Sequence, residues 1–344
     1  MPAVSGVFQP AVVWLEFALC ALLIGVAGTF LSRYGDVIAE KTGLSGTWIG
    51  VVLLATVTSL PELLTGVSAV AFAHVPNIAI GDALGSCVFN LLLITLLDFV
   101  SRGESVYRRA SQGHILSAGF GVMLISFVGL NVLLARHDDA LRIGHIGLYS
   151  PMIVLLYGVA MRTVFRYERE HMASFTEVRA ARYPDMTLRR AAARYGGAAA
   201  VVIGAGAWLP FVGRDLADVM GWHNTFVGTL FVAFATSVPE IVVSVAALRI
   251  DAPDMAIGNL FGSNLFDVLV IAVDDLFFFK GPILSFVSPV HAVSVVSAVM
   301  MTGLAIVGLL YRPDTRLFKA VGWTSLGLLA FYVMNSYVLF LYGE

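Results

Sequence analysis

Apolar runs long enough to cross a lipid bilayer recur along almost the whole of this 344-residue chain. A membrane-spanning helix needs about 20 predominantly apolar residues. Only 13% of the residues are charged and the mean hydropathy is +0.87, whereas a soluble protein has about 25% charged residues. So few charges cannot cover a globule that faces water on all sides. The sequence therefore predicts an all-α integral membrane protein.

Polar residues, prolines and glycines divide these runs into ten predicted membrane-spanning helices. The predicted spans are 11–31, 47–72, 78–99, 113–134, 146–165, 196–212, 225–248, 255–279, 283–310 and 320–341. Tracing the chain back and forth through ten spans puts 17 of the 21 Lys and Arg residues on one side of the membrane. Because positively charged loops face the cytoplasm, both termini are predicted to lie outside.

The polar segment 166–195 is predicted to be a cytoplasmic linker between a half of five spans at 1–165 and a second half at 196–344. The net charge of −2 gives no basic face for nucleic acid, so the lipid bilayer is the expected surrounding. Cys20 and Cys87 both lie inside apolar runs, which argues against a disulfide framework or a cysteine zinc site. We expect no resident cofactor and no obligate protein partner.

An internal repeat is the most specific feature of the sequence. Residues 50–62 match residues 228–240 at an offset of 178, and residues 79–90 match residues 256–267 at an offset of 177. The second copy is displaced from the first by five spans, and because five is odd the copies are predicted to lie upside down relative to each other. Inverted repeats of this kind build secondary transporters with a binding site near the midplane of the membrane.

Each copy places Thr-Ser-x-Pro-Glu inside a predicted span. Pro61 and Pro239 each remove a helical hydrogen bond, so the carbonyls that precede them are candidate ligands. Hydroxyls and carboxylates add further oxygens at Thr58, Ser59, Glu62, Thr236, Ser237 and Glu240. Oxygen-only ligand sets favour hard cations such as calcium, magnesium and sodium. A charge within the bilayer costs about 2.5–3.5 kcal/mol, so a repeated intramembrane Glu predicts cation coordination.

The neighbouring predicted span of each copy adds a second polar pair. Ser86 and Asn90 in the first copy, like Ser263 and Asp267 in the second, are four residues apart and share one helix face. Each pair is preceded by two glycines four residues apart, which is a pattern typical of close helix packing. Close packing and ligation are compatible at these positions.

With these motifs, the sequence resembles the cation/calcium antiporter superfamily, most closely its sodium/calcium exchanger branch. That family carries two alpha-repeats with a Gly-Thr-Ser-x-Pro-Glu core and a Gly-Ser-Asn-x-x-Asn/Asp core. The corresponding segments here are 57–62, 85–90, 235–240 and 262–267. The resemblance implies a sodium/calcium exchanger-like fold, with ten transmembrane helices in two inverted five-helix repeats and alpha-repeats at about 47–99 and 225–279.

The resemblance also implies the ligands and the activity. Implied calcium ligands are Glu62, Glu240, Thr58 and Thr236. Implied sodium ligands are Ala55, Thr58, Ser59 and Ser86 in one site, and Ala233, Thr236, Ser237 and Ser263 in the other. Asn90 and Asp267 match the polar pair that completes the centre. The implied activity is exchange of sodium for calcium by alternating access across the plasma (inner) membrane, without enzymatic catalysis.

The sequence departs from the family pattern at four positions. Val57 and Ala235 replace a glycine, Cys87 replaces an asparagine, and Asp82 stands where the second copy has Asn259. These departures leave ion selectivity open. Two further acids, Asp98 and Asp275, also align at the offset of 177 near the ends of their spans, and we expect them to be interfacial charges.

Alternative functions stay open from the residues alone. A calcium/proton antiporter would use the same carboxylates, although the Thr and Ser hydroxyls favour sodium. A potassium-linked antiporter is also open because Asp267 stands where other family members have Asn. An inverted repeat suits alternating access better than a channel. Two Glu residues without a His-metal set or a Ser/Lys dyad argue against an intramembrane enzyme.

Overall fold

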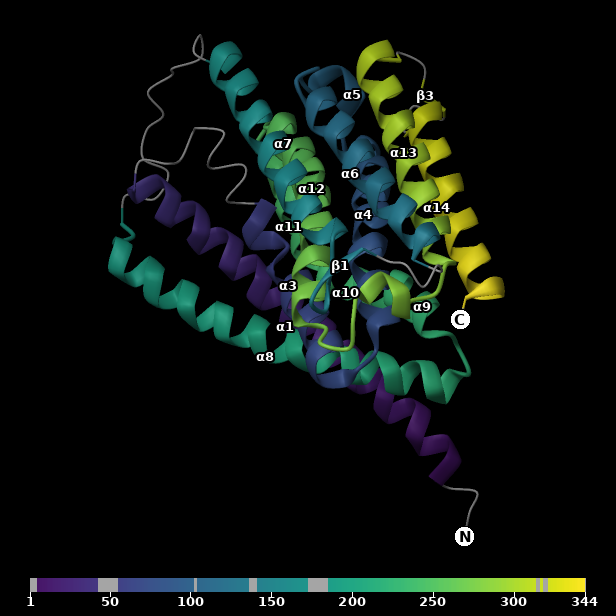
Figure 1. The fold of residues 1–344 in the computed structure, drawn as a ribbon. Coiled ribbons are helices and arrows are strands. Elements are labelled where there is room, and N and C mark those ends of the chain that lie inside the picture. The colour runs from purple at the N-terminus through teal and green to yellow at the C-terminus, as the bar shows by residue number, and fades with distance from the viewer. Residues whose placement is uncertain are drawn as a thin grey trace.

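The described residues fold into a bundle of long helices (Figure 1). The computed structural model describes residues 5–42, 55–101, 104–135, 141–172, 185–313, 316–317 and 321–343. The long helices are α1 (Ser5–Lys41), α4 (Pro76–Val100), α6 (His114–Leu134), α7 (Tyr149–Met172), α8 (Leu188–Met220), α12 (Pro253–Phe277), α13 (His291–Tyr311) and α14 (Trp323–Tyr342).

Shorter elements connect these helices or interrupt them. The short helices are α3 (Leu60–Ser68), η1 (Ala69–Ala73), α5 (Val106–Arg109), α9 (Asn224–Val227), η2 (Gly228–Val232), α10 (Ala233–Thr236), α11 (Val238–Arg249) and η3 (Ile283–Phe286). Two antiparallel hairpins pair β1 (Arg142–Ile143) with β2 (Ile146–Gly147), and β3 (Arg316–Leu317) with β4 (Val321–Gly322). Each hairpin leads directly into a long helix, α7 or α14.

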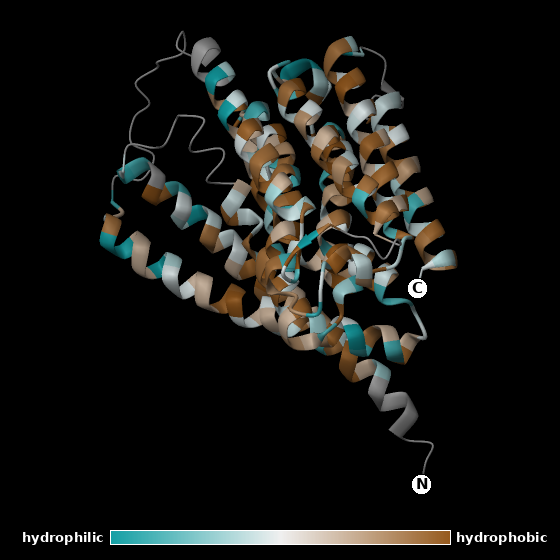
Figure 2. Cartoon of the chain, in the orientation of Figure 1, coloured by the Kyte–Doolittle hydropathy of each residue, from teal (hydrophilic) through white to brown (hydrophobic). Residues whose placement is uncertain are grey.

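The surface of the bundle is suited to lipid. In the described part of the chain, seven helices are long and apolar enough to cross a membrane, and the bent pair 224–236 and 238–249 would make an eighth. Large hydrophobic side chains such as Leu15, Leu130 and Tyr337 are exposed on outer faces, and Figure 2 shows how widely hydrophobic residues cover the helices. Exposed apolar surface on this scale calls for a lipid environment. The prediction of an all-α membrane protein is confirmed.

The predicted count of ten spans stays a prediction. Helix α7 corresponds to the predicted span 146–165, and α3 with η1 corresponds to the later part of 47–72, whereas residues 47–54 lie outside the described residues. The predicted linker 166–195 is partly helical, because α7 extends to Met172 and α8 begins at Leu188. Ala, Leu and Arg dominate this first part of α8, and all three are strong helix formers.

Two helices are interrupted at matched positions. Ser59 has φ −89° and ψ 11°, and α3 starts directly after it. Ser237 has φ −85° and ψ 8°, and it separates α10 from α11 with a bend of 46°. In each case a proline follows two residues later, so the i−4 hydrogen bond at that point is lost. The predicted interruption at each Pro-Glu is confirmed.

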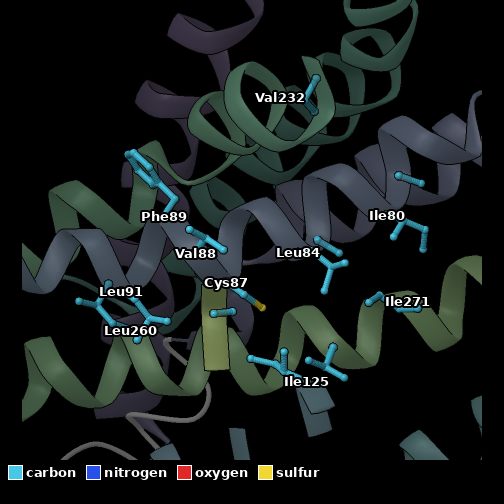
Figure 3. Close-up of a cluster of buried hydrophobic side chains, with 14 of the residues drawn as sticks. Ile80, Leu84, Cys87, Val88, Phe89, Leu91, Ile125, Val232, Leu260 and Ile271 are labelled. Atoms are coloured by element: carbon cyan, nitrogen blue, oxygen red, sulfur yellow. The ribbon is translucent and has the colours of Figure 1, made fainter. Parts of the chain in front are cut away.

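The centre of the bundle is formed by α4 and α12. The apolar windows of these two helices are 72% and 78% buried, the highest values among the candidate spans of the described residues. Figure 3 shows buried side chains of α4 beside those of α12 and α6, among them Leu84, Ile271 and Ile125. Glycines bring α4 close to η2: a Cβ on Gly81 would lie 3.0 Å from the Thr229 nitrogen. The small-residue spacing therefore does serve helix packing.

Helices α1 and α8 pack against each other along much of their length and cross the bundle obliquely (Figure 1). Glycines again mark their contacts with the interrupted helices. Gly28 of α1 lies against Pro239 of α11, and a Cβ on Gly206 of α8 would lie 3.6 Å from the Pro61 carbonyl oxygen. Both proline interruptions are thus covered by a helix that presents backbone rather than a bulky side chain.

The two aligned acids Asp98 and Asp275 are buried structural groups, so the expectation that they are interfacial charges is wrong. Both are 0% exposed. Asp98 accepts hydrogen bonds from the Ser105 hydroxyl at 2.7 Å and the Val106 amide at 3.2 Å. It also accepts from the Gly322 amide at 3.0 Å and the Ser325 hydroxyl at 2.9 Å.

Asp275 accepts the matching set of bonds. Its carboxylate accepts from the amides of Gly147 at 2.8 Å and Ile283 at 2.7 Å, and from the hydroxyls of Tyr149 and Ser150. Val106 and Ile283 are themselves 177 residues apart, so the repeat extends to these contacts. Each carboxylate fixes the start of a long helix and an adjoining loop.

We expect Gly85→Ala to destabilise the protein by about 1–3 kcal/mol, the usual cost of overpacking a core. The added Cβ would overlap the Thr229 carbonyl oxygen and lie 2.7 Å from the Thr229 Cα, and backbone atoms cannot yield as a side chain can. The measurement is chemical denaturation of purified protein in detergent micelles. Gly119→Ala is the control, because apart from its own stretch of helix backbone no atom of the described residues lies within 4 Å of its added Cβ. Equal stabilities of the two variants would contradict the prediction.

We expect Asp275→Ala to lower the free energy of unfolding by about 3 kcal/mol or more. Buried donors that lose their acceptor each carry a desolvation penalty of about 1–3 kcal/mol, and four donors converge on this carboxylate. The same denaturation assay applies. Asp215→Ala, which removes an acid with a side chain 49% exposed, serves as the control, and a similar small effect in both variants would refute the structural role.

Candidate functional site

The interrupted helices meet at the centre of the bundle, where serine hydroxyls of each half bind a glutamate of the other half. The Ser59 hydroxyl donates to Glu240 Oε1 at 3.1 Å, and the Ser237 hydroxyl donates to Glu62 Oε1 at 3.2 Å. All four residues are at most 1% exposed. The structure therefore brings both predicted carboxylates and both predicted serines into one buried cluster.

The predicted threonines and alanine carbonyls line the same cluster. Thr58 Oγ1 donates to the Ala55 carbonyl at 3.0 Å, and Thr236 Oγ1 lies 3.2 Å from the Ala233 carbonyl. The Ala55 carbonyl also accepts the Ser59 amide, and the Ala233 carbonyl accepts the Ser237 amide, both at 3.0 Å. In this conformation both carbonyls are thus already engaged in hydrogen bonds within their own helix.

The polar pairs of α4 and α12 complete the cluster. The Ser86 hydroxyl lies 3.1 Å from that of Ser237, and the Ser263 hydroxyl donates to Glu240 Oε1 at 3.3 Å. Asn90 Nδ2 donates to Asp267 Oδ2 at 3.4 Å. Every residue predicted from the sequence as a ligand therefore lies in or beside one buried site.

The cluster has more acceptor oxygens than donors. One oxygen of each acidic or amide group in the centre has no hydrogen-bond partner among the residues that the structure describes: Glu62 Oε2, Glu240 Oε2, Asn90 Oδ1 and Asp267 Oδ1. Burying a carboxylate without a partner is strongly unfavourable. Cations or protons can compensate such a site, and the hydroxyl and amide oxygens around it suit a hard cation.

Two residues that the ligand prediction omitted also contact the site. Thr236 Oγ1 donates to Asp82 Oδ1 at 2.9 Å, and in the other half Thr58 Oγ1 lies 3.4 Å from Asn259 Oδ1. The sequence marked Asp82 only as a departure from the repeat. Asp274 was missed altogether, although an acid inside an apolar span is by default a functional candidate.

Cys87 and Asn264 occupy matched positions where α4 and α12 cross. Asn264 Nδ2 donates to the Cys87 carbonyl at 3.2 Å, and the Cys87 thiol lies 3.7 Å from the Asn264 carbonyl. The replacement of asparagine by Cys87 thus falls at a helix contact.

In the described ranges no group of three or more His, Cys, Asp and Glu forms a metal site, so any cation site here also relies on hydroxyl, amide or carbonyl oxygens.

Comparison with known proteins identifies the family. The sodium/calcium exchanger protein family matches residues 12–166 and 193–341, which include both repeats and exclude most of the linker. This chain belongs to that family. Its members are transporters and not enzymes, so the recognition from sequence and the expectation that the chain is not an enzyme are confirmed. A relative in Methanocaldococcus jannaschii, an uncharacterized membrane protein, is 26% identical over 326 residues, which cover 91% of this chain and 97% of the relative.

Solved structures share the fold of this exchanger-family chain. The H+/Ca2+ exchanger CAX superposes with a TM-score of 0.70 at 15% identity, covering 96% of this chain and 82% of that one. The sodium-calcium exchanger NCX_Mj superposes with a TM-score of 0.61 at 22% identity, covering 94% of this chain and 98% of that one. The similarity supports a cation/calcium exchanger fold.

We expect Glu240→Gln to unfold at a higher temperature than the wild type in buffer cleared of metal ions. The substitution removes a buried charge whose Oε2 has no partner in the described part of the chain, and relieving that burial is favourable. Calcium should then raise the melting temperature of the wild type more than that of the variant, because binding stabilises by mass action. Thermal unfolding of detergent-solubilised protein tests this, with Asp215→Asn, which changes a half-exposed acid, as the control. A Glu240→Gln variant that melts below the wild type without metal would contradict the prediction.

Proposed function

We propose that this chain is a secondary antiporter that exchanges sodium for calcium by alternating access. Calcium would be held by the carboxylates of Glu62 and Glu240 with the backbone carbonyls of Thr58 and Thr236. Two sodium sites would flank it, formed by Ala55, Thr58, Ser59 and Ser86 and by Ala233, Thr236, Ser237 and Ser263. Asn90 and Asp267 would complete the centre.

The observation that carries this proposal is the surplus of buried acceptor oxygens between the two glutamates. Glu62 and Glu240 each keep one oxygen without a donor among the described residues, and the hydroxyls of Ser59 and Ser237 already reach the other oxygen. Two carboxylates balance the double positive charge of one calcium ion, whereas the surrounding neutral hydroxyls suit the single charge of sodium.

The same site explains coupling. An empty site would leave both glutamates charged and without hydration, which is costly in a membrane interior. Calcium or sodium neutralises this charge, so the loaded protein changes access more readily than the empty one. Ion flow in one direction is then tied to counterflow in the other.

The membrane arrangement is part of the proposal. We place ten spans in two inverted five-helix repeats, with both termini outside and the linker 166–195 in the cytoplasm of a plasma (inner) membrane. Support comes from the displacement of the repeat copies by five spans, from the distribution of Lys and Arg, and from the matched bonds of Asp98 and Asp275.

Sodium-gradient-driven uptake of radioactive calcium into proteoliposomes tests the function. We expect wild-type uptake to require sodium inside, and Glu62→Gln or Glu240→Gln to reduce it more than about 100-fold. Removing one partner from a buried charged site costs about 3–5 kcal/mol, which corresponds to that factor. Ser336→Ala, which removes a hydroxyl bonded to the Tyr332 carbonyl of its own helix, is the control. Uptake near the wild-type level in either Gln variant would refute the site.

A calcium/proton exchanger is the second candidate. Its supporting observation is the number of buried acids at the centre, where Asp82 and Asp267 join the two glutamates, because carboxylates can exchange a metal for protons. Uptake driven by a pH gradient in sodium-free vesicles would favour this candidate over sodium coupling. A potassium requirement in the same assay would instead indicate the potassium-linked alternative.

A further inference from the structure

The two threonines of the central cluster face side chains of different charge. Asp82 of α4 aligns with Asn259 of α12 at the repeat offset of 177, and both residues are at most 1% exposed. Asp82 Oδ1 accepts from Thr236 Oγ1 at 2.9 Å, whereas Asn259 Oδ1 lies 3.4 Å from Thr58 Oγ1. One threonine thus faces a carboxylate, and the other faces a neutral amide.

The rest of each acceptor group also differs between the halves. The Asn259 amide donates to the Ser244 hydroxyl at 3.3 Å, but the residue that aligns with Ser244 in the first copy is Gly66, which has no hydroxyl. Asp82 Oδ2 has no partner among the described residues. Within the described part of the chain, Thr236 is therefore the side chain to which the Asp82 carboxylate is hydrogen-bonded.

This difference decides where each threonine directs its hydroxyl hydrogen. A hydroxyl donates only one hydrogen. The shortest contact of Thr58 Oγ1 is with the Ala55 carbonyl, at 3.0 Å. Thr236 Oγ1 lies 2.9 Å from Asp82 but 3.2 Å from the Ala233 carbonyl, and a charged acceptor forms the stronger hydrogen bond. Thr58 therefore donates along its own helix, whereas Thr236 donates to α4.

The backbone carbonyls of the two halves are left in different states. A carbonyl oxygen has two lone pairs. That of Ala55 accepts both the Ser59 amide and the Thr58 hydroxyl, so both lone pairs are used. The Ala233 carbonyl accepts the Ser237 amide at 3.0 Å, but the hydrogen of the neighbouring threonine is directed at Asp82. One lone pair of Ala233 therefore stays available to a cation.

We propose that Asp82 is a positioning residue that makes the flanking site of Ala233 and Thr236 the tighter of the two sodium sites. By accepting the hydrogen of Thr236, it leaves the oxygens of Thr236 and Ala233 free to bind the ion. The inference rests on the proposed function, which assigns sodium to these oxygens. Calcium is held there by glutamate carboxylates and threonine backbone carbonyls, so its binding does not depend on the direction of a hydroxyl.

Sodium binding to the Asp82→Asn variant tests the proposal, because asparagine is close in size to aspartate and already occupies the matched place in α12. The readout is the rise in melting temperature of full-length protein in calcium-free detergent buffer, with choline keeping the ionic strength constant. We expect the variant to need at least tenfold more sodium for half of the maximal rise. The calcium concentration for half of the maximal rise, measured without sodium, should change less than threefold.

Asp215→Asn is the control, because it neutralises a half-exposed acid and should leave both ion responses unchanged. Three results would overturn the proposal: a wild type that does not respond to sodium, an Asp82→Asn variant with the sodium dependence of the wild type, or equal losses of sodium and calcium affinity. Equal losses would indicate that Asp82 only supports the fold.

Thr236→Val tests whether Asp82 acts through the threonine hydroxyl. The substitution removes the hydroxyl but keeps the backbone carbonyl proposed for calcium, so a preserved calcium response verifies that the variant is folded. In the Thr236→Val protein we expect Asp82→Asn to change the half-maximal sodium concentration less than twofold. A tenfold effect that persists without the hydroxyl would overturn the positioning role.

These measurements separate the role of Asp82 from the proposed function. Melting reports binding alone, so a chain that shows the expected sodium responses but does not exchange sodium for calcium in vesicles would refute the proposed function only. Conversely, sodium-driven calcium uptake by a chain whose sodium response is unaffected by Asp82→Asn would refute the role of Asp82 only.

Discussion

A carboxylate removed from water needs hydrogen-bond donors or a cation in place of its lost hydration. At the centre of this bundle the serine hydroxyls that reach Glu62 and Glu240 come from the opposite half of the chain and satisfy one oxygen of each. The second oxygen of each glutamate has no donor among the described residues, and the surrounding helices hold it in place. Much of the architecture can be understood as support for this buried surplus of acceptors.

Helix interruption and close packing provide that support. The breaks fall at Ser59 and Ser237, the second hydroxyl residue of each Thr-Ser-x-Pro-Glu motif. Glycines on α4 allow it to approach η2. Where α4 packs against α12, Asn90 and Asp267 come within bonding distance of each other. Helices α1 and α8 then cover both prolines. The cluster is therefore built from helix ends and helix crossings, and its polar side chains come from both halves.

The sequence identified the residues that meet in the central cluster because repetition reveals which polar residues share a place. Glu62, Ser59 and their counterparts at a fixed offset were recognisable without knowledge of the fold. Asp98 and Asp275 were misread, because their hydrogen-bond donors are amides and hydroxyls of distant loops, and no local pattern reports such partners. Asp274 has an apolar counterpart, so a search for repeated polar residues passes over it. The start of α8 within the predicted linker reflects helix propensity that a hydropathy pattern does not measure.

The bonds of Asp98 and Asp275 have a consequence for how the chain acquires its structure. Asp98 belongs to the first half but accepts from Gly322 and Ser325 of the second, and Asp275 of the second half accepts from Gly147 and Ser150 of the first. Each half supplies only part of the donors that its own buried acid accepts from. A half synthesised alone would lose the donors that come from the other half, so each half depends on the other to complete the hydrogen bonds of its buried acid.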